Sequence, residues 1–156
     1  MKKVLVINGP NLNLLGKREV NVYGEKSLNE IIAEMKKECK KLELTLETFQ
    51  SNSEGEIVSK IGKSIGKVDA VIINPGAYTH TSVAIRDAIS ATNISTIEVH
   101  LSNIYKREEF RHKSLIAPVA LGQISGFGWY SYILALYAVR NLIRENITTK
   151  NTKKKK

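Results

Sequence analysis

Polar side chains able to bind or transform a small molecule follow one short apolar run near the middle of the chain. The run is Val71 to Ile73, and the polar residues after it are Asn74, Tyr78, Thr79, His80 and Asp87. Consecutive β-branched residues predict a strand buried on both faces, and in open α/β sheets ligands bind at the carboxyl ends of the strands. The alternative is a turn whose Asn and His satisfy only nearby backbone groups. This stretch alone does not decide between the two interpretations.

Predicted strands and helices alternate along the rest of the chain. Hydrophobic patterning places strands at residues 3–8, 44–50, 71–73, 95–99 and 118–124, and helices at 27–42, 54–65, 82–91, 106–112 and 129–145. Ser27 with Glu30, and Ser53 with Glu56, have the spacing of capping boxes at helix starts. Gly66 is expected to end the second helix in a left-handed conformation.

This alternation predicts an α/β fold with a parallel sheet and helices on both faces. With five strands the expected arrangement is flavodoxin-like, with strand order 2-1-3-4-5 and a ligand crevice between the first and third strands. That order brings Asn11, Asn74 and His80 to one crevice, with His100 arriving from the fourth strand. Residues 1–145 are expected to form a single α/β domain, and residues 146–156 a basic, disordered tail.

The positive charge of the chain is concentrated near its end. The 156 residues carry a net charge of +9, but residues 146–156 hold five lysines and no acid, which leaves 19 basic and 15 acidic residues, or +4, in the remainder. A lysine run after Ile147, the last apolar residue, is most simply a solvated tail, and nucleic-acid binding through it is the less favoured alternative. No apolar run approaches the length of a membrane span, so we expect a cytoplasmic protein that contacts no membrane.

Disulfide, metal and nucleotide sites are not favoured by the sequence. Cys39, the single cysteine, lies on the apolar stripe of a predicted helix and is expected to pack in the core. The three histidines, His80, His100 and His112, are spread over separate segments, which does not suit a zinc site. The loop at residues 9–16 lacks the Gly-Lys-Ser/Thr ending of a phosphate-binding P-loop.

Four blocks of residues together resemble the type II 3-dehydroquinate dehydratases. The blocks are Gly9 to Glu19 with Tyr23-Gly24, Gln50-Ser51-Asn52 with Glu54-Gly55-Glu56, Ile73 to Ser82 with Arg86-Asp87, and Glu98 to Asn103 with Arg107 to Arg111. They run in the order of the family and span nearly the whole chain. The departures are mild: Val20 stands where the family usually has proline, and Lys113 where histidine is common.

The resemblance implies a hydro-lyase of the shikimate pathway, which leads to chorismate and the aromatic amino acids. Its reaction is the reversible dehydration of 3-dehydroquinate to 3-dehydroshikimate plus water, and it needs no metal or other cofactor. A proton next to the substrate ketone leaves to give an enolate, and a hydroxyl then departs as water. The resemblance also implies a homododecamer built as a tetramer of trimers.

The resemblance further implies a role for each site residue. Tyr23 is the base, and His100 is the acid that protonates the leaving hydroxyl. Because the ordinary pKa of a phenol is about 10, such a base needs a cation beside it, and Arg18 is the expected cation. Asn11 is expected to hold a water against the enolate oxygen, and Glu98 to orient the imidazole of His100. The implied substrate contacts are Asn74, His80, Asp87, Leu101, Ser102 and Arg111.

Some questions stay open at the level of sequence. The loop at residues 13–23 is expected to act as a lid over bound substrate, and Arg107 serves either a subunit contact or loop closure. The competing classes are a flavodoxin-like binding or signalling domain and a nucleic-acid binder. The signalling version is weak, because it requires clustered aspartates at the strand ends, where this chain has Asn8 and Asn74.

Overall fold

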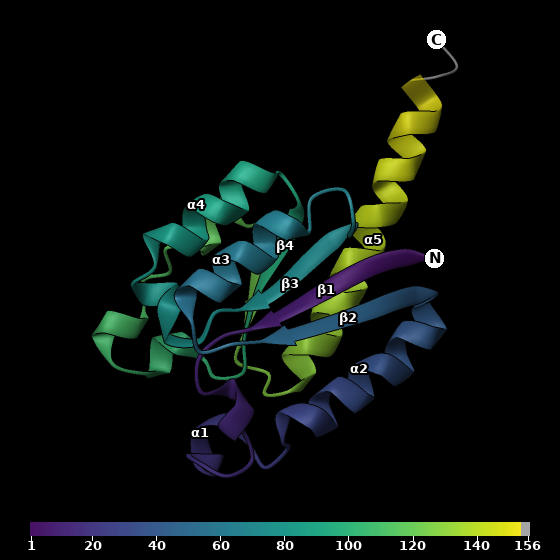
Figure 1. Cartoon of the computed structure of the whole chain (residues 1–156). Coiled ribbons are helices and arrows are strands. Elements are labelled where there is room, and N and C mark those ends of the chain that lie inside the picture. The colour runs from purple at the N-terminus through teal and green to yellow at the C-terminus, as the bar shows by residue number, and fades with distance from the viewer. Residues whose placement is uncertain (154–156) are drawn as a thin grey trace.

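Five parallel strands form one sheet at the centre of the molecule (Figure 1). The computed structural model describes the backbone of residues 1–153 and the side chains of residues 1–146. The strands are β1 (Lys2–Asn8), β2 (Leu44–Gln50), β3 (Ala70–Asn74), β4 (Ser95–His100) and β5 (Gly122–Ser125), in the order β2-β1-β3-β4-β5. The predicted flavodoxin-like sheet is therefore confirmed, and the carboxyl ends of β1 and β3 lie side by side, with Asn8 opposite Asn74.

Helices cover both faces of the sheet (Figure 1). One face packs against α2 (Leu28–Leu42) and α5 (Tyr130–Lys153), and the other against α3 (Glu54–Lys63) and α4 (Val83–Thr92). Because successive side chains of a strand point to opposite faces, Val4 and Val6 enter the first core, and Leu5 and Ile7 enter the second.

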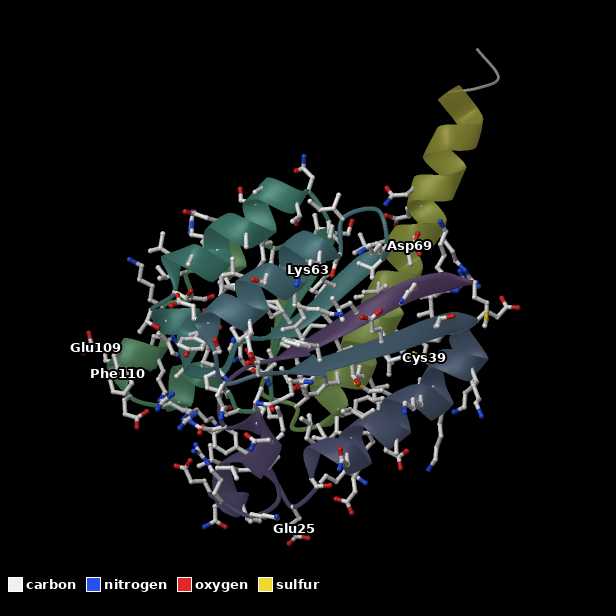
Figure 2. All side chains as sticks on the ribbon, in the orientation of Figure 1. Glu25, Cys39, Lys63, Asp69, Glu109 and Phe110 are labelled. Carbon is white, nitrogen blue, oxygen red and sulfur yellow. The ribbon has the colours of Figure 1, made fainter. Side chains whose placement is uncertain are left out.

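The start of α2 follows the sequence prediction closely. The Ser27 hydroxyl accepts from the Glu30 amide at 3.2 Å and the Glu30 carboxylate accepts from the Ser27 amide at 2.7 Å, which completes the capping box. Cys39 lies between α2 and the sheet (Figure 2), buried as predicted. Burial raises the pKa of the Cys39 thiol to about 11, so this residue behaves as a packing group.

The start and the end of α3 differ from expectation. Ser53 accepts from the Glu56 amide at 3.3 Å, but the Glu56 carboxylate bonds to the hydroxyl of Ser51 and does not complete a capping box. The helix ends at Lys63, and Gly66, with a φ of 71°, lies in the turn beyond it. The prediction that Gly66 directly ends the helix is therefore wrong, because the chain leaves the helix before it reaches the glycine.

Two further elements differ from the prediction. The fifth strand begins at Gly122 and not at residue 118, because Pro118 lies in the 3-10 helix η5 (Ala117–Val119) and has no N–H to give a sheet. The helix expected at 106–112 is two 3-10 turns, η3 (Ile104–Lys106) and η4 (Glu109–Arg111).

The last helix is longer than predicted and extends beyond the body of the molecule (Figure 1). The backbone of residues 146–153 belongs to α5, where a disordered tail was expected. Residues 154–156 lie outside the described part of the chain, so the tail and its boundary with the domain stay predictions. Among the described helices, none combines the length and apolarity needed to cross a bilayer.

Candidate active site

A cavity of about 270 Å³ opens at the carboxyl ends of β1, β3 and β4. Nine of the residues singled out from the sequence line it: Asn11, Arg18, Tyr23, Asn74, His80, His100, Leu101, Ser102 and Arg111. They come from the loop after β1, the turn after β3, the end of β4 and η4. The strand order alone brings these segments together, as the switch-point argument predicts.

Asp87 is the exception among the expected substrate contacts. It does not line this cavity and is exposed on α4. That helix buries Ile85 and Ile89, and because a helix turns about 100° per residue, Asp87 faces away from that side. Its role as a substrate contact stays a prediction.

The strands β1 and β3 approach very closely where the cavity begins. The Gly9 amide donates to the Asn74 carbonyl at 2.8 Å. A Cβ atom on Gly9 would lie 2.3 Å from the Pro75 carbonyl oxygen, so no larger residue fits without moving the backbone. This contact fixes Asn11 relative to Asn74.

The loop after β1 is held by the residues that follow β2. Asn11 adopts a left-handed conformation with a φ of 66°, and its amide donates to Oδ1 of Asn52 at 3.0 Å. Gln50 Nε2 donates to the same oxygen at 3.1 Å and to the Gly9 carbonyl at 3.2 Å. The Gln50-Ser51-Asn52 block therefore supports the segment that carries Asn11 into the cavity.

The hydroxyl of Tyr23 accepts a hydrogen bond from Arg107, and Arg18, the arginine named from the sequence, lies near the tyrosine ring. It ends the short helix α1 (Val20–Tyr23), and Arg107 Nη1 donates to its hydroxyl oxygen at 2.7 Å. The guanidinium of Arg18 lies 5.6 Å from the centre of the tyrosine ring and pairs with Glu19 at 2.7 Å. Arg107 thus joins Arg18 beside the phenol, and the role of Arg18 as the cation that favours the phenolate stays a prediction.

Glu98 lies behind His100 and is fully buried. Its carboxylate accepts from His100 Nε2 at 2.7 Å, from Thr79 and Ser114 at 2.8 Å, and from Gln123 at 2.9 Å. Burial acts to raise the pKa of Glu98, but the hydrogen bonds from His100, Gln123 and Ser114 and the charge of His100 outweigh burial and lower it. The carboxylate is thus ionised and fixes Nε2 of His100 as a donor.

The ring of His80 is hydrogen-bonded through Nδ1, whereas that of His100 is bonded through Nε2. Its Nδ1 lies 2.8 Å from the Lys113 carbonyl, and because a carbonyl only accepts, Nδ1 carries a proton. Burial lowers the pKa of His80, and the nearby charges of His100 and Arg111 lower it further against the opposing effect of the Lys113 bond. The neutral ring favoured in this way offers Nε2 as an acceptor. The His80 and His100 rings are stacked with their centres 6.5 Å apart.

The charge of the cavity lining favours an anionic ligand. Among the described lining residues, Arg18, Arg107 and Arg111 are cationic, and none is Asp or Glu. Within the described residues, no three His, Cys, Asp or Glu side chains are grouped as a metal site would need. The arrangement therefore fits acid–base chemistry on a small, negatively charged molecule.

Sequence reasoning missed the residues that hold the site residues in place. They are Asn52 on Asn11, Tyr132 on Asn74, and Ser114 and Gln123 on Glu98. Thr79 and Arg107 were named from the sequence, but not as partners of Glu98 and Tyr23. A glutamate in an apolar strand signals that such partners exist, because a buried charge must be paired or hydrogen-bonded. The sequence does not identify them, since they come from distant segments.

The fold and the cavity define a class: a flavodoxin-like α/β protein with ionisable side chains gathered in a cavity at its switch point. A family model described as dehydroquinase class II matches residues 2–140. The 3-dehydroquinate dehydratase of Caldicellulosiruptor bescii is 62% identical over 144 residues, covering 92% of this chain and 99% of the relative. That of Clostridium perfringens is 58% identical over 143 residues, covering 91% and 99%.

Solved structures agree with the sequence comparisons. The crystal structure of the type II dehydroquinase from Butyrivibrio crossotus superposes with a TM-score of 0.87 at 48% identity, covering 88% of this chain and 97% of that one. The type II dehydroquinase from Propionibacterium acnes also gives a TM-score of 0.87, at 38% identity, covering 90% and 97%. The chain belongs to the class II dehydroquinase family.

Proposed function

We propose that this chain dehydrates 3-dehydroquinate to 3-dehydroshikimate through an enolate, as a hydro-lyase of the shikimate pathway. The observation that supports the proposal is that one cavity contains two side chains able to transfer protons, each hydrogen-bonded to a charged residue. The Tyr23 phenol is bonded to Arg107, and the His100 imidazole is bonded to Glu98. Membership of the family supports the same substrate.

Tyr23 acts as the base in this proposal. A guanidinium beside a phenol oxygen favours the anion. Arg107 Nη1 donates to the Tyr23 oxygen at 2.7 Å, and Arg18, the cation that the resemblance implies, lies 5.6 Å from the ring centre. The phenolate takes the proton from the carbon next to the ketone, and the electron pair moves onto the ketone oxygen to form the enolate. Asn11, at the start of the loop, holds the water that stabilises this oxygen.

His100 acts as the acid in the second step. The imidazolium donates a proton to the hydroxyl that leaves as water, while the enolate collapses to the conjugated enone. Glu98 stabilises the charged ring and fixes its orientation through the 2.7 Å bond to Nε2. The net change is loss of one water from the substrate, so the reaction requires no oxidant or reductant.

The remaining lining residues bind the substrate. The Asn74 amide, the His80 Nε2 atom and the Arg111 guanidinium contact its ring hydroxyls, and the backbone N–H groups of Leu101 and Ser102 take its carboxylate. All five line the cavity, and its arginines supply the charge that an acid substrate needs. The loop at residues 13–23 closes over the substrate.

Turnover of 3-dehydroquinate, followed by the ultraviolet absorbance of the enone, tests the function. We expect Tyr23→Phe to lower kcat by about a thousandfold or more, while a product analogue binds with little change. Near-normal kcat in this variant would contradict the assignment of the base. Inactivation by borohydride in the presence of substrate would instead reveal an imine and exclude an enolate route without covalent attachment.

We also propose a cytoplasmic homododecamer, a tetramer of trimers, in keeping with the resemblance. Large side chains on the surface support assembly: Tyr105, Phe110, Leu121, Phe127 and Tyr130 are exposed in the single chain, and Phe110 points outward beside Glu109 (Figure 2). Sedimentation velocity tests the stoichiometry, and fractionation of cells tests the location. A monomer at micromolar concentration would contradict the assembly.

A further inference from the structure

A chain of hydrogen bonds lies buried between the ends of β1 and β3 and the first turn of α5. The Gly76 amide donates to Asn74 Oδ1 at 3.1 Å, and Asn74 Nδ2 donates to the Tyr132 hydroxyl at 3.0 Å. That hydroxyl in turn donates to Asn8 Oδ1 at 2.6 Å. Asn8, Asn74 and Tyr132 are 1%, 2% and 0% exposed, and of these three only Asn74 lines the cavity.

The direction of every bond in this chain is set from the Gly76 end. A backbone N–H can only donate, so Asn74 must turn its oxygen towards Gly76 and its nitrogen towards Tyr132. The phenol then accepts from Asn74, and its single proton goes to Asn8. The Nδ2 atom of Asn8 is left buried without a partner among the described residues. The opposite direction would pair that atom but set the nitrogen of Asn74 against the Gly76 amide.

We propose that Tyr132 is a positioning residue: by holding Nδ2 of Asn74, it prevents the side-chain amide from turning over. A ligand in the cavity then meets one N–H and one oxygen lone pair of Asn74 in fixed places. Without the bond to Tyr132, the side-chain amide of Asn74 would have to become ordered when the ligand binds, and the entropy lost in this ordering weakens binding. The inference rests on the proposed function, in which Asn74 contacts a ring hydroxyl of the substrate.

The phenol of Tyr132 suits this role over a wide pH range. Burial raises the pKa of Tyr132, and the hydrogen bond from Asn74 opposes this rise only in part. The hydroxyl therefore keeps its proton at neutral and mildly alkaline pH. Tyr132 does not line the cavity, so it affects a bound ligand only through Asn74.

Steady-state kinetics of a double-mutant cycle test the inference. The variants are Tyr132→Phe, Asn74→Ala and the two combined. Tyr137→Phe is the control, because this tyrosine lies on the same helix, is half exposed and bonds to Glu38 on the outside. We expect Tyr132→Phe to raise KM about five- to tenfold, the size of one lost hydrogen bond, with kcat within about twofold of wild type. The control is expected to match wild type.

The cycle separates a positioning role from a packing role. If Tyr132 acts through Asn74, the double variant has the KM of Asn74→Ala within about twofold. An unchanged KM in Tyr132→Phe, or effects that multiply in the double variant, would overturn the inference. Should Tyr132→Phe not fold, Asn8→Ala removes only the acceptor of the phenol; a KM raised about threefold supports the inference, and an unchanged KM overturns it. Absence of 3-dehydroquinate turnover in the wild type would instead refute the proposed function.

Discussion

Glu98 carries a charge at a place from which water is excluded. Moving a lone carboxylate into an apolar interior is very costly unless it is paired and hydrogen-bonded. Four side chains supply those bonds, and three of them, from Thr79, Ser114 and Gln123, come from segments on either side of β4. The charge that holds Nε2 of His100 is therefore supported by groups that do not line the cavity.

Stability should depend on pH through Glu98. Its pKa is lowered from 4.5 in the folded protein, so its contribution is present above about 4.5 and is lost as pH falls through the lower, folded value. We expect Glu98→Gln to reduce the free energy of unfolding by about 2–4 kcal/mol at pH 7, because the donors around it lose a charged acceptor. The difference should shrink below pH 4.5 or so in urea unfolding series.

Glu34→Gln is the matched control for this series. Glu34 pairs with Lys37 on the exposed side of α2, and its replacement should change the free energy of unfolding by less than about 0.5 kcal/mol. A change in the free energy of unfolding for Glu98→Gln that is as small as in the control, or that does not vary with pH, would contradict the inference that Glu98 is an ionised, hydrogen-bonded carboxylate.

At the scale of elements, the carboxyl ends of β1 and β3 decide where the cavity lies. Gly9 permits the close approach of the two strands, and the turns that follow carry Asn11 and His80. The sequence predicts these turns well, because Pro and Gly after a β-branched run leave few alternatives. It does not predict the partners that hold the turns, since those depend on three-dimensional packing.

Gly9→Ala should damage both stability and activity. The added methyl group meets the Pro75 carbonyl oxygen at 2.3 Å, so the strand ends must separate. We expect a loss of about 2–4 kcal/mol in the free energy of unfolding and a fall in kcat/KM as Asn11 and Asn74 move apart. Gly62→Ala is the control, because a Cβ there meets nothing within 4 Å and the position is helical; it should be neutral or stabilise by up to about 1 kcal/mol. Equal effects of the two changes would refute the close-approach argument.

At the scale of the whole molecule, the fold could be predicted from sequence more fully than the site. Alternation of strands and helices gave the sheet order, and the block resemblance gave the residues that line the cavity. Two local outcomes were not predicted: Pro118 shortens β5, and Arg107 donates to the Tyr23 hydroxyl while Arg18 pairs with Glu19. The arginine contacts depend on which charged groups lie nearest in three dimensions, and the spacing of residues along the sequence does not give those distances.

The end of the chain should be dispensable for catalysis. Among the residues whose side chains are described, the last buried apolar one is Ile143, and none beyond Arg111 lines the cavity. We expect a chain ending at Glu145 to keep kcat/KM within about twofold and to elute from heparin at lower salt, because five lysines are removed. Loss of turnover would show that residues 146–156 contribute to the active assembly.

Residues 113–115 contact the groups that hold both imidazoles of the cavity in place. Lys113 offers its carbonyl to His80, Ser114 donates to the carboxylate behind His100, and the Leu115 amide binds the Thr79 carbonyl. One added or deleted residue here would shift the two rings together, so the spacing between them cannot be tuned independently by lengthening this stretch. Redesign for a larger ring should therefore widen the opposite wall, formed by the loop after β1, and leave residues 113–115 at their present length.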